Sequence, residues 1–174
     1  MTGASRPEYV VEPLNSSHDR LAFYSGVPEL DRYLHQQAGQ DARRKAAAPF
    51  VMLDQSGSIV GYYTLSAYSI YLSELPDAVA KKLPRYPRLP VTMLGRLAVA
   101  SSHRGQKLGR FLLMDALQRS WKATAEVGSI GVVVEALDEG ALAFYRHHEF
   151  QSLPGHPDKL FLAMATIARA LSLR

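Results

Sequence analysis

The spacing of hydrophobic residues in the first half of the chain predicts a strand, a helix and a β-hairpin. A short apolar run over Tyr9–Val11 suits the first strand. From Pro28 to about Lys45, apolar residues recur at helical spacing behind a proline in the favoured first helical position. Phe50–Leu53 and Ile59–Tyr71 are rich in β-branched and aromatic residues and flank the turn Asp-Gln-Ser-Gly, which predicts the hairpin. We expect its aromatic side chains to form core and cross-strand pairs, and Gly61 to mark a bulge or a close backbone approach.

A proline-rich segment separates the hairpin from the second half of the chain. Pro76–Leu83 suits a short helix, and the following Pro84–Pro90 has the sequence PRYPRLP. Because proline has a fixed φ and no backbone N–H, this second stretch cannot form a helix interior or a central strand. We therefore expect an extended connection that leads into a central strand over Met93–Val99.

The second half of the chain alternates helices and strands. Leu113, Leu117 and Trp121 fall at four-residue steps, which predicts a helix buried along one face. Val132–Glu135 is an apolar run of the kind found in buried parallel strands. The remaining predicted elements are a helix over Glu139–His148, strands at Phe150 and Leu160–Ala165, and a terminal helix over Thr166–Leu173. This order predicts an α/β fold with a mixed central sheet and helices on both faces.

Composition places the chain among ordinary globular proteins. Its 174 residues suit a single domain over residues 1–174, and its hydrophobic and charged fractions, 47% and 21%, are average. No apolar run approaches the length of about 20 residues that a membrane span needs. The first nine residues, MTGASRPEY, lack the apolar core of a signal peptide. We therefore expect a cytoplasmic protein with no membrane partner.

Metal and thiol chemistry are disfavoured. The chain has no cysteine, which excludes disulfides, thiolate metal sites and a cysteine nucleophile. His147 and His148 are adjacent, so on a helix they point in different directions and cannot share one metal ion. We expect no metal site, and we expect Asp138 to cap the helix that follows it.

The formal net charge of +4 permits a polyanionic partner without requiring one. The positive charge is concentrated in two clusters, each of which could be a solvated face or a set of phosphate contacts. The first basic cluster consists of Arg43, Arg44 and Lys45, and the second of Lys81, Lys82, Arg85 and Arg88.

The loop between the central strand and the next helix has the features of an anion site. A helix that begins directly after a strand leaves its first backbone N–H groups unpaired, and its dipole adds positive potential there. Gly105 and Gly109 let a phosphate approach the backbone closely, while Arg104, Lys107 and Arg110 supply cationic donors. The spacing matches neither G-x-G-x-x-G nor G-x-x-x-x-G-K-S/T. The loop suits a diphosphate, the alternative being an ordinary surface turn.

This loop resembles the pyrophosphate-binding loop of the GNAT acetyltransferases, which has the pattern Q/R-x-x-G-x-G/A between a strand and a helix. The pattern is filled here by Arg104, Gly105, Gln106, Lys107, Leu108 and Gly109. Lys107 stands where the family usually has its first glycine. A lysine can supply the same backbone N–H if its φ is negative, so we expect a negative φ at Lys107.

A second resemblance to the same family lies farther along the chain. GNAT enzymes often have the pattern A-x-x-F/L-Y-x-x-x-G-F, which Ala141, Phe144, Tyr145 and Phe150 fit, with Glu149 in place of the glycine. The resemblance implies that the Tyr145 hydroxyl lies near the thioester sulfur. A phenol with a reference pKa of about 10 keeps its proton at neutral pH and can donate it to a departing thiolate. We interpret Tyr145 as the catalytic acid, the alternative being a core aromatic residue.

The resemblance implies a GNAT fold with acetyl-CoA as the acetyl donor. In that fold two neighbouring parallel strands splay apart and open a slot for pantetheine. Here these strands would be Met93–Val99 and Gly131–Glu135, and the backbone groups of Leu97, Ala98 and Val99 would pair with the pantetheine amides. With no cysteine to form an acyl-enzyme, we expect direct transfer to an amine.

The chain as a whole resembles one branch of the family, the acetyltransferase toxins of bacterial toxin–antitoxin pairs. This resemblance runs from about Phe23 to Met164, through FYSGVPELDRYLHQQAGQDARRK, VGYYTLSA, LPRYPRLPVTMLGRLAV and EALDEGALAFYRHHEF. It implies acetylation of the α-amino group of aminoacyl-tRNA, which blocks translation, together with a homodimer and a ribbon-helix-helix antitoxin. The two basic clusters and Arg96 would then contact tRNA phosphates, although Arg96 could instead be structural.

The chemistry of the α-amino group suits an enzyme without an obvious base. Its reference pKa of about 7.7–8.0, against about 10.4 for lysine, leaves a useful fraction neutral. Two alternatives stay open. One is a GNAT acetyltransferase that acts on a small-molecule amine or a protein N-terminus. The other is a non-catalytic acyl-CoA-binding or antitoxin-docking module, suggested by Lys107 and Glu149 replacing two expected glycines.

Overall fold

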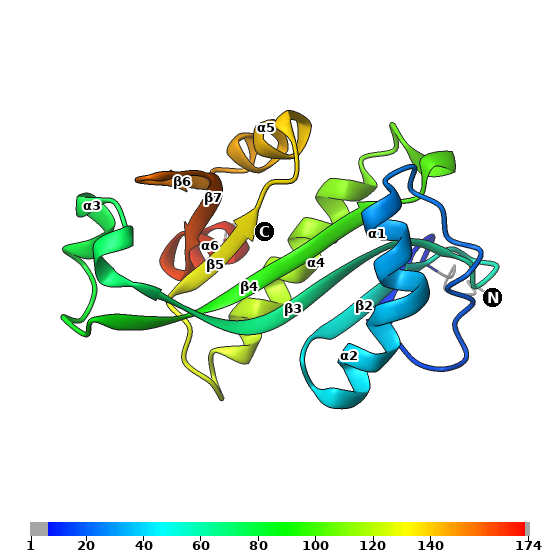
Figure 1. The fold of residues 1–174 in the computed structure, drawn as a ribbon, viewed down its shortest axis with the longest axis horizontal. Coiled ribbons are helices and arrows are strands. Elements are labelled where there is room, and N and C mark those ends of the chain that lie inside the picture. The colour runs from blue at the N-terminus through cyan, green and yellow to red at the C-terminus, as the bar shows by residue number, and fades with distance from the viewer. Residues whose placement is uncertain (1–6, 173–174) are drawn as a thin grey trace, which may run out of the picture. The chain divides into compact units, whose positions relative to one another are not determined.

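The computed structural model describes residues 7–172, whose seven strands form one mixed sheet in the order β1-β2-β3-β4-β5-β7-β6 (Figure 1). β4 and β5 are parallel, whereas the other described neighbours are antiparallel. The strands are β1 Val10–Pro13, β2 Ala48–Leu53, β3 Ile59–Tyr71, β4 Arg88–Val99, β5 Gly131–Glu135, β6 Gln151–Leu153 and β7 His156–Ala163. The predicted α/β fold with a mixed sheet is confirmed.

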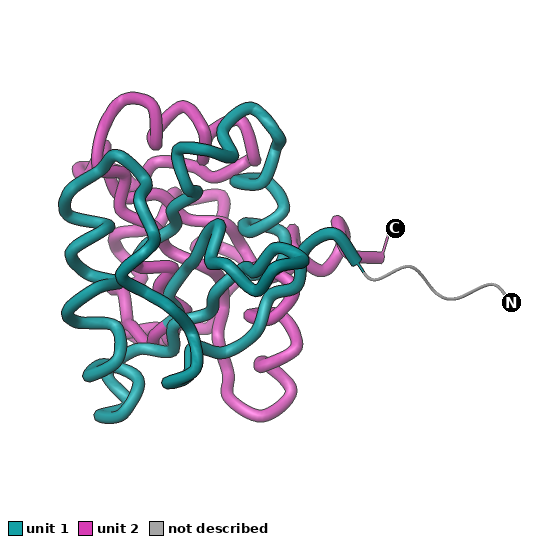
Figure 2. The backbone as a smooth tube through the Cα atoms, turned by 90° about the vertical axis from the view of Figure 1, so that its right-hand side faces the viewer, with its two compact units in different colours: residues 1–65, 96–116 teal, residues 66–95, 117–174 magenta. Residues whose placement is uncertain are grey.

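The chain divides into two compact units, which Figure 2 colours separately. Unit 1 comprises the residues up to 65 together with 96–116, and unit 2 comprises 66–95 together with the residues from 117 onward. Strands β3 and β4 and helix α4 (Leu108–Ala123) therefore contribute residues to both units.

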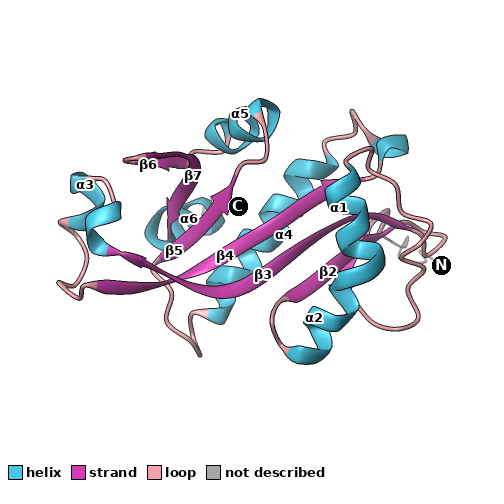
Figure 3. Cartoon of the chain, viewed as in Figure 1, coloured by secondary structure: helices cyan, strands magenta, loops and turns pink. Residues whose placement is uncertain are grey.

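Figure 3 distinguishes the helical elements from the strands by colour. The α-helices other than α4 are α1 Pro28–Arg32, α2 Ala38–Arg44, α3 Asp77–Ala80, α5 Glu139–His147 and α6 Met164–Ser172. Three short elements have other helical geometry: a π-helix η1 at Tyr33–Gln37 and two 3-10 helices, η2 at Leu72–Glu74 and η3 at Ser101–His103. The predicted terminal helix is confirmed up to Ser172, and Leu173 lies outside the described residues.

One continuous helical stretch, formed by α1, η1 and α2, confirms the helix predicted from Pro28 to about Lys45. Its middle turn is the π-helix η1, a wider turn that accommodates one extra residue. The helix ends where Lys45 adopts a left-handed φ of +62°. The first basic cluster therefore occupies the carboxyl end of α2, where the helix dipole favours positive charge.

In unit 1 the side chains of β3 alternate between two helical layers. The Tyr62 hydroxyl reaches α1 and donates a 2.7 Å hydrogen bond to the Leu30 carbonyl. A Cβ on Gly61 would instead lie 2.7 Å from Leu112 Cδ1 of α4 and 3.0 Å from the Ala98 carbonyl oxygen. Because successive strand residues face opposite sides, α1 and α4 cover opposite faces of this part of the sheet. The close backbone approach expected at Gly61 is confirmed.

The core of unit 1 lies between the sheet and the α1–α2 stretch and contains three aromatic rings. The Tyr62 ring meets Phe23 edge-on at 5.6 Å and lies stacked with Tyr33 at 6.3 Å between centroids. Such pairs add stabilisation beyond the area they bury. The rings therefore fix the position of the helix against the sheet.

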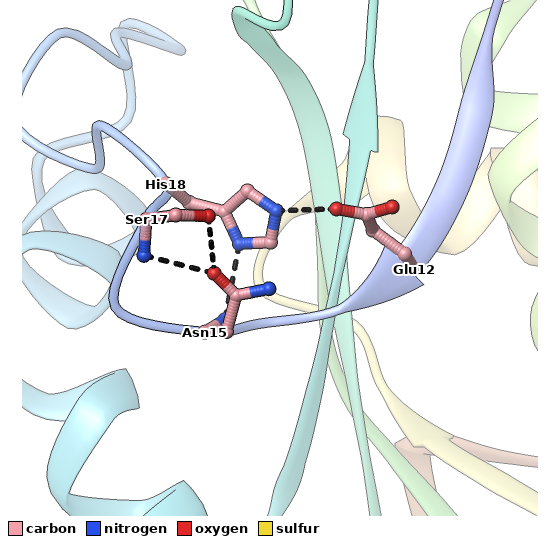
Figure 4. A network of polar contacts seen from close by, with 4 residues as sticks. All are labelled: Glu12, Asn15, Ser17 and His18. Carbon is pink, nitrogen blue, oxygen red and sulfur yellow. Dashed lines mark hydrogen bonds and ion pairs between the residues drawn. The ribbon is translucent and has the colours of Figure 1, made fainter.

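A polar network closes the loop that follows β1 (Figure 4). His18 Nε2 lies 2.7 Å from Glu12 Oε1, and the Asn15 backbone N–H donates to His18 Nδ1 at 3.0 Å. Because Nδ1 accepts this bond, Nε2 carries the proton that faces Glu12. The Ser17 N–H donates to Asn15 Oδ1 at 2.8 Å, so the loop is held by its own side chains.

Unit 2 is built around β5, whose three valines are buried. Its pairing with β4 runs from Thr92–Val132 to Leu94–Val134, and β7 lies antiparallel on its other side. The predicted buried parallel strand is confirmed. The opening of the two strands beyond these pairs stays a prediction.

Strand β4 begins five residues earlier than predicted. Arg88, Leu89 and Pro90 lie in the strand, so the prediction of an extended connection through Pro90 is wrong at its end. Pro90 has no N–H, but its carbonyl accepts a 2.9 Å hydrogen bond from the Ile130 N–H. Only an acceptor is used at this position, and a strand can therefore include a proline there.

The predicted buried face of α4 is confirmed except in its last turn. Leu113 and Leu117 are buried, but Trp121 is 40% exposed, so its predicted burial is wrong. Residues 121–123 are all exposed, which means that the buried stripe ends with Ser120. Periodicity alone does not show where the covering partner ends. Among residues 7–172, no helix combines the length and apolarity that crossing a membrane requires.

Candidate active site

The loop between β4 and α4 has a glycine-like backbone at two positions. Gly105 has a φ of +81° and Lys107 a φ of +60°. The expectation of a negative φ at Lys107 is therefore wrong. The lysine adopts the left-handed conformation itself, although its Cβ makes that conformation unfavourable by about 1–2 kcal/mol. The backbone geometry that glycine would provide is thus present without glycine.

This geometry leaves consecutive backbone donors open. Within residues 7–172, the N–H groups from Gly105 to Gly109 have no hydrogen-bond acceptor. Left-handed residues alternate here with Gln106, whose φ is not positive, and such alternation lets neighbouring N–H groups converge on an anion. The 16-residue helix α4 starts at Leu108 and adds its dipole. The loop can hold a diphosphate.

Two distant segments of unit 1 hold the loop in place. Arg104 Nη2 donates a 2.6 Å hydrogen bond to the Ser25 carbonyl, and the Tyr9 hydroxyl donates to Gln106 Oε1 at 3.0 Å. Ser25 is itself fixed, because its N–H and hydroxyl donate to Asp31 Oδ1 at 2.9 and 2.6 Å. Ser25 and Asp31 are buried polar residues that sequence reasoning missed. Arg104 thus anchors the loop to the segment that contains Ser25.

The other residues predicted to bind the cofactor have mixed exposure. Gln106, Lys107 and Arg110 are exposed, whereas Leu108 is buried. In β4, Leu97 and Val99 are half-buried and Ala98 belongs to the core of unit 1. The Ala98 side chain therefore cannot touch a ligand, and a role for this residue is limited to its backbone groups.

Tyr145, in unit 2, is a buried phenol with a free hydroxyl. Its side chain is 7% exposed and lies between the rings of Phe144 and Phe150, at centroid distances of 5.2 and 5.4 Å. Within the described residues no group hydrogen-bonds to its hydroxyl. Burial raises the pKa of Tyr145, because an apolar surrounding disfavours the phenolate. Tyr145 therefore keeps its proton at neutral pH and, among residues 7–172, has no acceptor for it.

The turn after α5 accommodates Glu149 in the glycine position of the family pattern. Glu149 has a φ of +73°, its N–H donates to the Arg146 carbonyl, and the Phe150 N–H donates to the Tyr145 carbonyl. These two bonds and the Tyr145–Phe150 ring contact form a Schellman cap. At the other end of α5, Asp138 Oδ1 accepts from the Ala141 N–H, which confirms the predicted cap.

The predicted basic residues fall into both units. The first basic cluster is exposed in unit 1, and the second is exposed in unit 2. In the second cluster Arg88 donates a 2.7 Å hydrogen bond to the Tyr71 hydroxyl. Arg96, in unit 1, is half-buried and stacks on Tyr33 with its Cζ 3.6 Å from the ring centroid.

The hairpin tyrosines do not all lie in a core. Tyr62 and Tyr63 are buried, as expected, but Tyr68 and Tyr71 are exposed and each contacts a cation. Tyr68 and Tyr71 therefore do not lie in the core, but Tyr71 contacts Arg88 on the neighbouring strand β4, which agrees with the expected cross-strand pairs. Both lie in the part of β3 that belongs to unit 2. Among the described residues no three His, Asp or Glu side chains are grouped to hold a metal ion.

Comparison with known families and proteins agrees with this chemistry. Residues 14–150 match the family model described as the acetyltransferase (GNAT) family. The chain is 35% identical over 171 residues to the tRNA-acetylating toxin of Mycobacterium tuberculosis (strain ATCC 25618 / H37Rv), and the match covers 98% of each chain.

Solved structures show the same fold with an acetylated aminoacyl-tRNA bound, and with acetyl-CoA and the C-terminus of an antitoxin bound. AtaT complexed with acetyl-methionyl-tRNAfMet is 30% identical, with a TM-score of 0.87 over 94% of this chain and 99% of that chain. A tyrosine-to-phenylalanine variant of AtaT, bound to the C-terminus of the antitoxin AtaR and to acetyl-CoA, is 26% identical. Its TM-score is 0.81 over 95% of this chain and 99% of that chain.

Proposed function

Because this chain belongs to the GNAT family of acetyltransferases, we propose that it acetylates the α-amino group of aminoacyl-tRNA and thereby blocks translation. The observation that supports this proposal is the loop at Gly105–Gly109, whose open N–H groups can bind a diphosphate. It occurs in a chain that is similar to tRNA-acetylating toxins along nearly its whole length. Acetyl-CoA supplies the acetyl group.

The loop is proposed to bind the diphosphate of acetyl-CoA. Its open N–H groups fit the phosphate oxygens, and Lys107 and Arg110 add positive charge. Arg104 holds the loop against Ser25 and leaves its remaining donors available. The backbone groups of Leu97, Ala98 and Val99 are proposed to pair with the pantetheine amides.

Tyr145 is proposed to be the general acid. The substrate amine attacks the thioester carbonyl carbon, the C–S bond breaks, and the sulfur takes the Tyr145 proton. The amine loses its proton to solvent, and solvent returns a proton to the phenol. The raised pKa of Tyr145 suits this role because the acid form is present at neutral pH.

The partners follow from the same reasoning. We propose that both basic clusters and Arg96 contact tRNA phosphates, because each phosphate neutralised by a cationic side chain strengthens the binding. The chain is proposed to act as a single acetyltransferase domain, as a homodimer, in the cytoplasm where aminoacyl-tRNA is used. The solved complex of AtaT with AtaR supports an antitoxin partner, for which we propose a ribbon-helix-helix protein.

The decisive experiment follows radiolabelled acetyl-CoA into tRNA. We expect label in a pool of aminoacylated tRNA, none in the deacylated pool, and release of the label as N-acetyl-amino acid when mild base cleaves the ester. Pre-formylated aminoacyl-tRNA is the matched control, because its α-amino group is already blocked. Label that enters only small amines or protein N-termini would overturn the proposal, and no transfer at all would favour a non-catalytic module.

A further inference from the structure

Arg96 is a half-buried cation of β4 that takes no part in the proposed proton transfer. It lies on the same face of β4 as Ala98, a residue of the unit 1 core. Its Cζ is 3.6 Å from the centroid of the Tyr33 ring, which places the guanidinium directly on the aromatic face. The planar group is therefore held in one orientation.

Tyr33 is a rigid support for this guanidinium. Its ring is 6% exposed, lies stacked with Tyr62, and donates through its hydroxyl to Asp41 Oδ2 at 2.8 Å. Gln37 Nε2 donates to the other oxygen, Asp41 Oδ1, at 2.9 Å. The hydrogen bonds from Gln37 and Tyr33 lower the pKa of Asp41, so the carboxylate is ionised at neutral pH and keeps the ring in place.

The guanidinium has no acceptor of its own. Within residues 7–172 no carboxylate, carbonyl or hydroxyl accepts a hydrogen bond from Arg96, although its charge acts on the nearby Asp41 carboxylate and helps to lower the pKa of Asp41. A half-buried cation normally has a partner, because removing its hydration is unfavourable. A fork of five donors in a fixed plane fits the two oxygens of a phosphodiester.

We propose that Arg96 binds a phosphodiester in the single-stranded acceptor end of tRNA, next to the aminoacylated nucleotide. This inference rests on the proposed function. Arg96 precedes Leu97, the first residue proposed to pair with pantetheine, and this adjacency in sequence is our reason for assigning the phosphate next to the aminoacylated nucleotide. Lysine could not replace it, because a point charge neither stacks on Tyr33 nor forms two parallel hydrogen bonds.

The first test measures binding of deacylated tRNA and does not depend on catalysis. In Arg96→Gln the slope of log K against log salt should fall by about 0.7, the value of one phosphate contact on a single strand. Arg32→Gln is the matched control, because Arg32 is an exposed arginine of α1 outside the proposed site. An unchanged slope in Arg96→Gln, or an equal fall in Arg32→Gln, would overturn the proposal.

The second test compares two minimal substrates, aminoacyl-adenosine without a phosphodiester and an aminoacylated CCA trinucleotide. In Arg96→Lys the KM for the trinucleotide should rise roughly tenfold, as expected for a lost charge-assisted hydrogen bond, and the KM for aminoacyl-adenosine should rise less. Equal losses with both substrates would overturn the phosphate assignment. If the wild type acetylated neither these fragments nor intact aminoacyl-tRNA, the proposed function would fail. If it acetylated only intact aminoacyl-tRNA, the salt-dependence test would decide the role of Arg96.

Discussion

The turn before α4 and the turn after α5 place a charged residue in the same left-handed conformation, yet only one of them is closed by its own backbone. At Glu149 two backbone hydrogen bonds and the Tyr145–Phe150 ring contact complete a helix cap. At Lys107 the surrounding N–H groups have no acceptor within residues 7–172. The same backbone conformation therefore ends a helix in one place and leaves donors for a ligand in the other.

The largest expected effect is on kcat. It distinguishes the role of the Tyr145 proton in catalysis from the role of the Tyr145 ring in the helix cap. Tyr145→Phe should lower kcat by about 10²–10⁴-fold, the usual contribution of a general acid, because phenylalanine has no proton to donate. The ring contact with Phe150 is kept, so the melting temperature should not change. Steady-state kinetics and thermal unfolding measure the two effects, with the exposed Tyr86→Phe as control. Near-normal kcat in Tyr145→Phe would rule out the acid role.

The next effect concerns the anchored loop. Arg104→Ala removes the hydrogen bond to the Ser25 carbonyl, and a bond from a charged group is worth about 1.5–3 kcal/mol. We expect acetyl-CoA affinity to fall by about tenfold or more, measured by titration calorimetry. Arg146→Ala, in the α5 turn, is the control and should not change affinity. Unchanged binding in a folded Arg104→Ala protein would show that the loop does not need this anchor.

A smaller effect distinguishes the two left-handed residues. Both Glu149→Gly and Lys107→Gly should raise the free energy of unfolding by about 1 kcal/mol, because glycine removes the penalty at positive φ. Only Lys107→Gly should weaken acetyl-CoA binding, by up to about fivefold, since an exposed charge contributes little. Chemical denaturation and calorimetry test both. A loss of affinity in Glu149→Gly would contradict the comparison.

The smallest expected effect is the lack of a fall in rate at high pH. Burial raises the pKa of Tyr145, and a raised pKa keeps the acid form present at higher pH. The rate should therefore not fall between pH 7 and 9, and it should rise as the substrate α-amine, with a reference pKa of about 7.7–8.0, loses its proton. A pH–rate profile with a basic limb below pH 9 would contradict the protonated phenol.

Local patterns predicted most of the fold. The long helix from Pro28, the hairpin and β5 all follow from residues close in sequence, since periodicity is a local signal. The early start of β4 could not be predicted in this way, because the Ile130 N–H that pairs with Pro90 lies far along the chain. The exposure of Trp121 likewise depends on where its covering partner ends.

The parts of the candidate site that belong to short sequence motifs could be predicted, namely Arg104–Gly109 and Tyr145. The supports from Ser25, Asp31 and Tyr33 were missed because they act across distant segments; Arg104 and Ser25 are separated by 79 positions. A usable signal existed at Asp31, a carboxylate beside core-facing Leu30. The backbone at Lys107 was mispredicted from its side chain, although the glycine usual at that place in the family pattern indicated a left-handed residue.

The π turn at Tyr33–Gln37 contains one residue more than a turn of regular α-helix. Each residue of a regular α-helix rotates by about 100°, so positions eight apart diverge by about 80° and positions seven apart by about 20°. Tyr33 nevertheless meets Asp41, eight positions later, because the wide turn absorbs one residue. Loss of the exposed Gln36 would therefore leave phenol and carboxylate facing each other, whereas loss of a residue from α2 would rotate them apart.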